Sequence, residues 1–413
     1  MTDLTTAEQD MLDGGQGRGS ALAMHIVLAA ARCQGAAHLR EVSSAHVDSC
    51  LYHGQSSLDF VAAIAQDSAH VRVRTTLNVG SLDLHRPRLF RGPAEFAEQA
   101  RRLTTAYVSL GCLPTFTCAP YQLPGRPGYG EHVAWAESNA IAFGNSVLGV
   151  RTDRNGDFLD ISAAITGRVP DAGLHLEVNR AATAVFDVAA DVWGKFDRTL
   201  LPALLGHTIG RATGNRVPAV VGLAGQVIDE DWMKAFGAAA ASSGSVALFH
   251  LVGITPDAAD LNTALQDRPP AIRRSVSSDD LTIARSQLTT ATTSKPLGAV
   301  SLGTPHLSRA QLRLIADKTQ GSTVRVPTYA CTSRACLAAE PAAAQVLQAS
   351  GIQLVTDTCT YVTPIIEPTG VVLTDSAKWA YYAPANLGHT VMLASLDECL
   401  ASALAGSYQL EHR

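Results

Sequence analysis

Charge is sparse in this chain, and long basic runs are absent. Of its 413 residues, 17% are Asp, Glu, Lys or Arg, and the formal net charge is −5. Proteins that bind nucleic acid gather Lys and Arg into patches that neutralise phosphates. The absence of any such run excludes nucleic acid as the partner.

Long hydrophobic runs are also absent. The apolar stretches 219–224 and 246–252 are far shorter than the roughly 20 residues that a helix needs to span a bilayer. The first 15 residues carry four acidic side chains and no apolar core, so they do not resemble a signal peptide. The sequence therefore predicts a cytoplasmic protein without a membrane segment. In that reducing compartment, burial or metal binding explains the eight cysteines better than disulfides do.

Several catalytic signatures are missing as well. The sequence contains no Walker-type phosphate loop, and no GxGxxG motif lies between a strand and a helix. The strand–turn–helix motif that carries the nucleophile of serine hydrolases is absent too. Nucleotide chemistry and serine hydrolysis are therefore not expected.

The chain does show an alternation of strand-like and helix-like segments, most clearly in its last third. The apolar runs 299–302, 352–355 and 371–374 are typical of buried strands, and Ser308 and Ser376 are typical helix N-caps. This alternation predicts an α/β fold with parallel-rich sheets flanked by helices. The expected regions are an N-terminal one over 1–160, a middle one over 161–295 and a C-terminal one over 296–413.

Polar residues follow several of the expected strands. In open α/β sheets, ligands bind outside the carboxyl ends of the strands. Asn78, His306, Cys359 and Lys378 occupy such positions, although the pattern does not place them in one site. His306 could instead be a surface or cap residue. Lys378 opposes the positive end of its helix dipole, which indicates an anionic ligand.

A largely apolar helix is expected over 131–148, and it carries a row of polar side chains. A buried amide or hydroxyl without a partner costs about 1–3 kcal/mol. The row therefore either joins two subdomains or binds a polar substrate, with Arg151 as a carboxylate clamp. Its members are Glu137, Ser138, Asn139, Asn145 and Ser146.

Cys118 and Cys359 lie far apart in the sequence, each in a loop-like context rich in polar residues, proline or glycine. A buried structural cysteine usually lies inside a helix or strand, where it behaves as a small hydrophobic residue. We therefore interpret these two thiols as metal ligands, with iron as the metal. Cys331 and Cys336 have no close metal spacing and are interpreted as core or surface thiols.

Taken together, these segments resemble the large, catalytic subunit of the aconitase X family over nearly the whole chain. The longest similar stretch runs from WAESNA at 135–140 to NSVLGVRT at 145–152. The number and order of the matching segments make the resemblance specific. Further segments are 45–48, 75–78, 118–121, 241–244, 250–256, 305–306, 357–359 and 376–380.

The resemblance implies an aconitase-like architecture of several subdomains, with the active site and an iron centre at their junction. It implies dehydration, either of cis-3-hydroxy-L-proline to pyrroline-2-carboxylate or of mevalonate 5-phosphate. It also implies a small swivelling subunit that supplies a catalytic serine. Because the last similar segment lies near the end of this chain, the small subunit is expected to be a separate polypeptide.

One departure bears on the substrate. Archaeal, phosphate-handling members have a cysteine directly before the Pro305-His306 pair, where this chain has Thr304. The resemblance then favours the hydroxy amino acid as substrate, and a two-iron cluster or a single iron over a four-iron cluster. Cys112 resembles a cysteine of that branch and is the expected replacement ligand.

These arguments give a hypothesis for the site, because a Lewis-acidic metal stabilises the charge that develops during dehydration. Two alternatives remain: the large subunit of a phosphomevalonate dehydratase and a non-catalytic scaffold subunit. The expected metal ligands are Cys112, Cys118 and Cys359; the catalytic residues are His306, Glu137 and Lys378; the substrate-binding residues are His46, Asn78, Ser138, Asn139, Asn145, Arg151, Thr152, Ser242 and Ser243.

Overall fold

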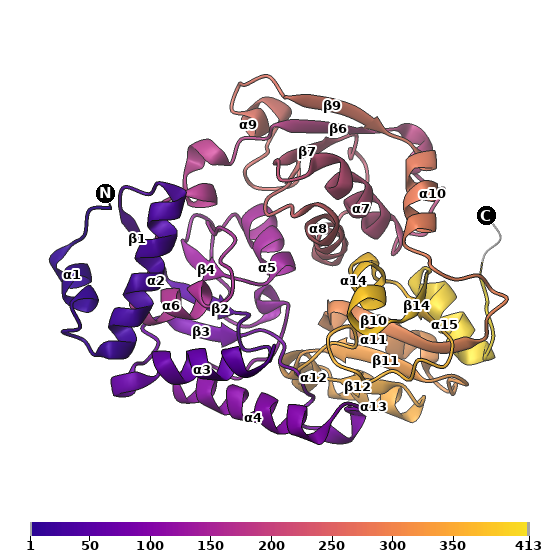
Figure 1. Ribbon diagram of the computed structural model, residues 1–413. Coiled ribbons are helices and arrows are strands. Elements are labelled where there is room, and N and C mark those ends of the chain that lie inside the picture. The colour runs from indigo at the N-terminus through magenta and orange to yellow at the C-terminus, as the bar shows by residue number, and fades with distance from the viewer. Residues whose placement is uncertain (1, 411–413) are drawn as a thin grey trace. The chain divides into compact units, whose positions relative to one another are not determined.

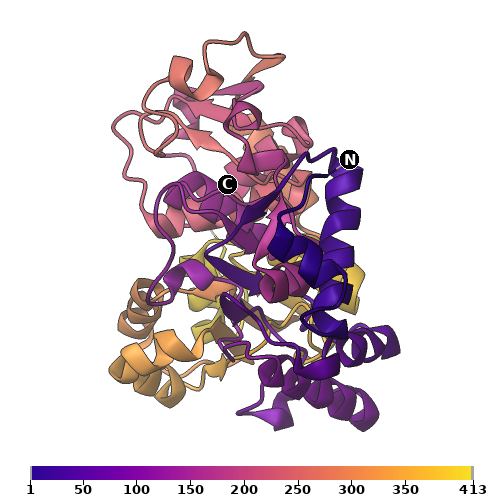
Figure 2. The same cartoon turned by 90° about the vertical axis from the view of Figure 1, so that its left-hand side faces the viewer.

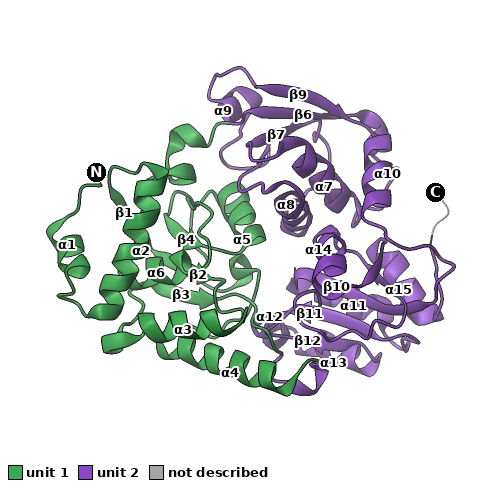
Figure 3. Ribbon diagram, viewed as in Figure 1, with its two compact units in different colours: residues 1–82, 92–181 green, residues 83–91, 182–413 purple. Residues whose placement is uncertain are grey.

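The computed structural model describes residues 2–410 and divides them into two compact units (Figure 3). Unit 1 comprises Met1–Leu82 and Gly92–Ala181, and unit 2 comprises Asp83–Arg91 and Ala182–Arg413. The short segment Asp83–Arg91 belongs to unit 2 because its ends bond there. The Asp83 carboxylate accepts a hydrogen bond from the backbone N–H of Thr356 at 2.9 Å, and Arg91 Nε donates to the carbonyl of Ile365 at 2.8 Å.

Unit 1 is built on a three-stranded parallel sheet in the order β3-β2-β4. A separate antiparallel pair joins β1 to β5. The strands are β1 Leu39–Glu41, β2 Ser44–Val47, β3 Arg74–Leu77, β4 Val133–Trp135 and β5 Arg168–Pro170.

Helices surround this sheet, and α1 lies beside α2 at the N-terminal end of the chain (Figure 1, Figure 2). The core face of α2 is set by its spacing, since Met24, Val27, Leu28 and Ala31 recur every three or four residues and are at most 3% exposed. The helices are α1 Thr6–Leu12, α2 Arg18–Gln34, α3 Gln55–Ile64, α4 Ala94–Ser109, α5 Ser138–Phe143 and α6 Leu159–Thr166, with 3₁₀ turns at Gln66–Ser68, Pro120–Gln122, Gly173–His175 and Glu177–Asn179.

The helix expected over 131–148 is wrong in its first part. Residues Val133–Trp135 form β4, helix α5 begins only at Ser138, and a π-helical turn over Gly144–Leu148 completes the segment. The apolar run of β4 pairs with β2. A short buried strand and a buried helix share the same continuous apolar pattern, so the sequence did not distinguish them. The polar row therefore begins at the carboxyl end of a parallel strand.

Unit 2 contains two sheets, and every strand pair in both is parallel. The first has the order β8-β7-β6-β9 and the second the order β12-β11-β10-β13-β14. This confirms the parallel-rich α/β fold. The strands are β6 Ala184–Val188, β7 Pro218–Val221, β8 His250–Leu251, β9 Ile272–Val276, β10 Leu297–Leu307, β11 Thr328–Thr332, β12 Gln353–Val355, β13 Val371–Thr374 and β14 Thr390–Leu393.

Helices connect the parallel strands of unit 2, as Figure 1 shows. No helix among residues 2–410 combines the length and the apolar character that crossing a bilayer requires. The helices are α7 Leu201–Thr213, α8 Glu230–Gly244, α9 Leu261–Leu265, α10 Ser278–Gln287, α11 Arg309–Thr319, α12 Arg334–Ala339, α13 Pro341–Ala349, α14 Ala377–Leu387 and α15 Leu396–Ala405, with 3₁₀ turns at Pro87–Leu89 and Ala190–Val192.

The sequence predicted the second sheet well because its strands are buried on both faces and read as continuous apolar runs. Val300, Leu354 and Leu373 are at most 2% exposed. Both expected helix caps are present: the hydroxyl of Ser308 accepts from the N–H of Gln311, and that of Ser376 accepts from the N–H of Trp379. Strand β11 was not expected, because the polar Thr328 and Thr332 flank a short apolar centre.

Helices α7 and α8 pack closely through glycines. A Cβ at Gly206 would overlap the backbone carbonyl of Phe236, and one at Gly210 would overlap the hydroxyl of Ser243. Because a backbone carbonyl cannot rotate away, the spacing of the two helices depends on Gly206.

We expect Gly206→Ala to lower the free energy of unfolding. Overpacking of a core costs about 1–3 kcal/mol, which exceeds the roughly 1 kcal/mol by which Ala favours a helix over Gly. Urea unfolding of the variant measures the loss, and Arg211→Ala on the exposed side of α7 is the control. A variant as stable as the wild type would contradict the close packing.

Candidate functional site

The three parallel strands of unit 1 deliver polar side chains to one edge of their sheet. Asp48 follows β2, Asn78 follows β3 and Glu137 follows β4. The Asn78 side-chain amide donates to the carboxylate of Asp48 and, at 3.2 Å, to that of Glu137. One amide group thus joins two carboxyl groups at the position where α/β sheets bind ligands.

Glu137 is held by donors from the start of α5. Its Oε1 accepts from the backbone N–H and the side-chain amide of Asn139, at 3.1 and 2.7 Å, and from the hydroxyl of Ser138 at 3.2 Å. The same Asn139 amide donates to the backbone carbonyl of Cys118 at 2.9 Å. Unit 1 therefore brings Asn78, the start of the polar row and the loop of Cys118 into one hydrogen-bond network.

His46 lies in β2, next to this network, and is fully buried. Its Nδ1 pairs with the hydroxyl of Thr76 at 2.8 Å. Burial lowers the pKa of His46 to about 4, although the nearby Glu137 carboxylate opposes this shift. The imidazole is therefore neutral at physiological pH, and its surroundings favour a positioning role over proton transfer.

Asp48 is a candidate functional residue that the sequence reasoning did not select. Burial raises its pKa to about 8, and the negative charges of Glu137, Asp157 and Asp160 add to the shift. The donor from Asn78 opposes it. Its place directly after a strand, two residues beyond His46, was the available signal. At neutral pH the carboxyl group of Asp48 is therefore protonated, and the Asn78 amide links it to Glu137.

Asp160, on α6, accepts hydrogen bonds from the loop after β2. Its carboxylate accepts from the backbone N–H of Asp48 at 2.7 Å and from the N–H and hydroxyl of Ser49, both at 2.9 Å. Burial raises its pKa to about 6 despite these donors. Asp160 thereby fixes the position of Asp48.

Three expected substrate-binding residues of unit 1 are engaged in internal contacts. Asn145 exchanges hydrogen bonds with the backbone of Thr152, at 2.8 and 3.1 Å, and its Oδ1 accepts from the buried Arg180 at 3.0 Å. Arg151 donates to the carbonyl of Gly149 at 2.7 Å and pairs with Glu177 at 3.1 Å. These contacts give Asn145, Thr152 and Arg151 a structural use in holding the chain after α5.

Cys112 lies in different surroundings from Cys118. Burial raises the pKa of the Cys112 thiol well above its ordinary value, and the charge of Asp160 adds to this. A charge on Cys112 would in turn raise the pKa of Cys50 and of Tyr107, so the Cys112 thiol lies near both of these side chains. A raised pKa disfavours the thiolate form that binds a metal.

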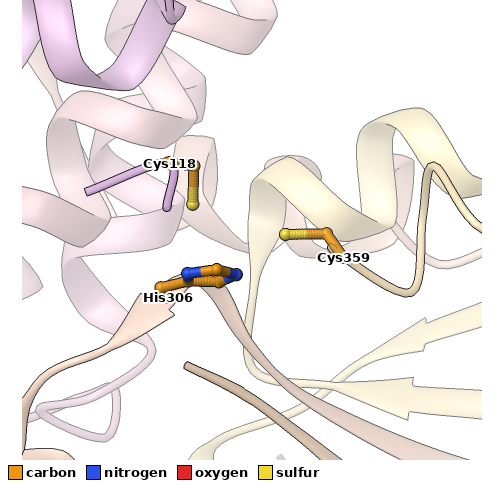
Figure 4. A group of neighbouring side chains, drawn as sticks. All are labelled: Cys118, His306 and Cys359. Carbon is orange, nitrogen blue, oxygen red and sulfur yellow. The ribbon is translucent and has the colours of Figure 1, made fainter. Parts of the chain in front are cut away.

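In unit 2, His306 near the end of β10 and Cys359 in the loop after β12 lie side by side (Figure 4). Both side chains are 0% exposed, and their ligand atoms lie within 4.8 Å of each other. Nε2 of His306 contacts the carbonyl of Thr358 at 3.2 Å. Because a carbonyl only accepts, Nε2 carries the proton and the lone pair of the neutral ring is on Nδ1. Figure 4 also labels Cys118, the buried thiol of unit 1.

The loop that carries Cys359 is held rigidly. Asp357 has a φ of +65°, and its fully buried carboxylate forms two hydrogen bonds with Arg334, at 2.6 and 2.7 Å. It also accepts from the backbone N–H of Leu84 at 3.1 Å. An Asp tolerates this left-handed conformation better than most residues do, and the ion pair stabilises it.

Cys331, on β11, lies beside Cys359. Its thiol pairs with the hydroxyl of Thr360 at 3.9 Å. The neighbouring Cys359 side chain, together with Thr360, lowers the pKa of the Cys331 thiol, against the effect of burial. Cys331 is therefore a buried thiol in contact with a candidate ligand, which its sequence spacing did not indicate.

The remaining expected residues of unit 2 have other surroundings. The hydroxyl of Ser242 bonds to the carbonyl of Ala239, and that of Ser243 bonds to the carbonyls of Ala239 and His207, so both serve the packing of α7 and α8. Lys378 is buried, with Nζ 5.8 Å above the ring of Tyr361.

A cavity of about 300 Å³ lies in unit 2, at the ends of β10 and β13. Thr304 and Lys378 line it together with Asp375, whose pKa burial raises to about 6. The buried hydroxyl oxygen of Thr304 has no hydrogen-bond partner among the described residues 2–410. Thr304, the residue that departs from the expected cysteine, thus lines the same cavity as the lysine expected to bind an anion.

The raised pKa of Asp48 predicts a pH-dependent stability. Its folded-state value of about 8 exceeds the ordinary 3.8, so the folded protein retains a proton that the unfolded chain releases. This contribution is complete below about pH 4 and is lost as the pH rises through about 8, by at most about 1.4 kcal/mol per pH unit. Asp48→Asn keeps an acceptor for Asn78 but cannot ionise, so its unfolding free energy should fall less over this range and exceed that of the wild type near pH 8.

Urea unfolding at a series of pH values measures this difference. Asp59→Asn, on the exposed side of α3, is the control and should follow the wild type. The same pH dependence in Asp48→Asn and the wild type would show that Asp48 does not hold the proton.

Comparisons with known proteins agree with this fold. Models of three aconitase X domains match the chain, the first domain over residues 1–178, the second over 182–286 and the third over 297–405. The crystal structure of Thermococcus kodakaraensis aconitase X in its holo-form is similar, with a TM-score of 0.87 and 30% sequence identity. That similarity covers 97% of this chain and 100% of the other.

Curated relatives carry two enzyme names. Cis-3-hydroxy-L-proline dehydratase of Pseudomonas aeruginosa is 40% identical, over 98% of this chain and 70% of its own length. The enzyme of the same name from Hypocrea jecorina is 38% identical, over 98% and 69%. The phosphomevalonate dehydratase large subunit of Methanothermobacter thermautotrophicus is 35% identical, over 93% and 94%. With these similarities along nearly its whole length, the chain belongs to the aconitase X family.

Proposed function

We propose that this chain is the large subunit of an iron-dependent hydro-lyase that dehydrates cis-3-hydroxy-L-proline to pyrroline-2-carboxylate. The observation that supports this most is the 38–40% identity, over 98% of the chain, to two dehydratases named for that substrate. The buried His306–Cys359 pair supplies donors that suit iron.

The donor set is consistent with an iron centre. In a protein, a metal-bound histidine usually donates its other N–H to a carbonyl or carboxylate, as Nε2 of His306 does to Thr358. We propose that Nδ1 of His306 and the sulfurs of Cys359 and Cys118 hold the iron. The ligand atoms of His306 and Cys359 lie close enough to share one metal or one small cluster. This assignment gives His306 a role as ligand, instead of the proton delivery expected from the sequence.

Cys112 is the weaker candidate of the three cysteines. Its raised pKa and its acidic neighbour Asp160 oppose the thiolate form, while Cys118 is linked through its backbone carbonyl to Asn139. Incomplete thiolate ligation would suit a two-iron cluster or a single iron with an open position for substrate oxygen. The buried hydroxyl of Thr304, which lacks a partner among residues 2–410, supports a further polar group in that region.

Iron bound there would supply Lewis acidity toward the substrate hydroxyl and carboxylate. Substrate binding and proton donation depend on side chains of this chain. Ser138, Asn139 and Asn78 hold Glu137 as a carboxylate acceptor, which suits the ring ammonium of the substrate. Asp48 is protonated at neutral pH and can donate a hydrogen bond or a proton. Lys378 would bind the substrate carboxylate.

The electrostatics of unit 1 favour an amino acid over a phosphorylated substrate. Asp48 and Glu137 follow strands at one edge of its sheet, and burial together with the charges of Glu137, Asp157 and Asp160 raises the pKa of Asp48. A phosphate dianion placed there would add to that repulsion. Phosphomevalonate dehydration is the alternative activity for this chain, because several archaeal relatives are named phosphomevalonate dehydratase large subunit.

A partner subunit follows from the comparisons. Several relatives are named large subunits, and the chain covers 94–99% of their lengths in four archaeal proteins. It covers only 69–70% of the two hydroxyproline dehydratases. We propose that a separate small, swivelling subunit pairs with this chain and supplies a serine that acts as the base.

Iron analysis of three cysteine variants tests the ligand set. Cys118→Ala and Cys359→Ala are expected to lose most of the iron and the activity, because each removes a direct bond to the metal, whereas Cys112→Ala should retain iron. Iron per chain is measured on anaerobically purified protein. Full iron content in Cys118→Ala and Cys359→Ala would exclude the proposed centre, and iron loss in Cys112→Ala would restore Cys112 as a ligand.

Turnover by the complex with its small subunit tests the substrate. We expect conversion of cis-3-hydroxy-L-proline and at least about tenfold lower kcat/KM with mevalonate 5-phosphate, since tenfold corresponds to about 1.4 kcal/mol of discrimination. Pyrroline-2-carboxylate is measured as the product. The reverse preference would assign the chain to phosphomevalonate dehydration, and an iron-free, inactive complex would indicate a scaffold.

A further inference from the structure

Lys234, on α8, is a lysine buried against the end of β10. Its side chain is only 3% exposed, and lysine is rarely buried to this degree without partners. Nζ donates to the backbone carbonyl of His306 at 3.2 Å and to the side-chain oxygen of Gln311 at 2.5 Å, and it pairs with the carboxylate of Asp231 at 2.8 Å. These three acceptors match the three N–H donors of an ammonium group.

The partners of Lys234 also hold the start of α11, two residues after His306. Oε1 of Gln311 accepts from the backbone N–H of Ser308 at 3.1 Å, and the hydroxyl of Ser308 donates to Asp231 at 2.6 Å. Lys234 therefore holds the chain directly at His306 and, through its two partners, at Ser308. The segment 306–308 cannot shift relative to α8 without breaking several of these bonds.

The imidazole of His306 is consequently fixed at two points. Lys234 holds its backbone carbonyl, and the carbonyl of Thr358 contacts ring Nε2 at 3.2 Å. The direction of Nδ1 depends on the backbone position and on the rotation of the ring, and each contact fixes one of these. The ligand atoms of His306 and Cys359 lie within 4.8 Å of each other, a separation that a backbone shift would change.

Stability by itself does not explain an ammonium group at this position. Moving a charge out of water is costly, and apolar residues of similar volume often stabilise a protein at least as well as a buried ion pair does. Ala238 and Leu314 line the same cavity as Lys234, so an apolar side chain would find apolar neighbours there. The ammonium group provides directed hydrogen bonds, which an apolar side chain does not.

We propose that Lys234 is a positioning residue, whose hydrogen bond to the His306 carbonyl keeps Nδ1 of His306 directed at the iron centre. This inference rests on the proposed function, because it needs His306 as a metal ligand. Groups behind a metal ligand orient it, and their removal commonly lowers metal affinity or activity about ten- to hundredfold. Because Lys234 acts on the metal through His306, its effect depends on the presence of that imidazole.

A double-mutant cycle tests this dependence in anaerobically purified, iron-loaded protein. Lys234→Met removes the charge and the donors but keeps an unbranched side chain, and His306→Ala removes the imidazole. Lys318→Met is the control, because it removes another lysine of unit 2 from an ion pair, formed with the exposed Asp397 at 2.9 Å. Iron affinity is measured by competition with a chelator, and the electron paramagnetic resonance spectrum is recorded for each variant.

In protein that retains His306, Lys234→Met should lower iron affinity about tenfold or more and alter the spectrum. In the His306→Ala background, the same substitution should change the affinity by no more than about twofold, the range expected for independent effects. Lys318→Met should match the wild type in both measurements.

Three outcomes would overturn the inference alone. The first is unchanged iron affinity and spectrum in Lys234→Met. The second is an equal loss of affinity with and without the His306 imidazole, which would make the role of Lys234 purely structural. If Lys234→Met does not fold, Lys234→Met/Asp231→Asn replaces it, because that variant removes both charges. The third is failure of this double variant to fold, which would assign Lys234 to the stability of unit 2.

Failure of the proposed function would have a different signature. Wild-type protein that binds no iron would overturn the proposed iron centre. Wild-type iron affinity and spectrum in His306→Ala would remove His306 from the ligand set. In either case the inference about Lys234 would fall with the proposed function.

Discussion

The structure depends on the satisfaction of polar groups buried at the carboxyl ends of parallel strands. A parallel sheet covered on both faces leaves its ends as the place where polar side chains meet, and each of them must find a partner there. In unit 1 the Asn78 amide joins Asp48 to Glu137. In unit 2 the Thr360 hydroxyl joins Ser301, Cys331 and Trp379.

This constraint gives similar side chains different chemistry. Glu137 accepts several hydrogen bonds from α5, whereas Asp48 has the donor from Asn78 and three carboxyl groups nearby. One carboxyl group is thus stabilised as an acceptor and the other is protonated at neutral pH.

The same reasoning separates the cysteines. Cys359 follows a strand, beside His306, and a loop stabilised by the Asp357–Arg334 ion pair presents it. Cys112 lies near Asp160, where a thiolate is unfavourable. Thiol chemistry in this protein therefore depends on the charge around each sulfur, and the distance between cysteines along the chain does not reveal it.

Sequence reasoning found the elements whose burial is uniform. The runs 299–302, 352–355 and 371–374 were recognisable as strands because both faces are apolar, and Ser308 and Ser376 were recognisable as caps because capping uses a local bond. It missed β4 because three buried residues before a helix have the same apolar pattern as the helix itself.

The residues of the candidate site likewise fall into those that local sequence patterns indicated and those that only the tertiary structure revealed. The sequence by itself determined which side chains follow the strands it could recognise, since that depends on local patterns, and so indicated Asn78, His306 and Cys359. Only the tertiary structure decided their partners: Asp48 for Asn78 and Thr358 for His306. Burial and neighbouring charge arise from residues distant in sequence, and these set both the pKa values and the hydrogen bonds.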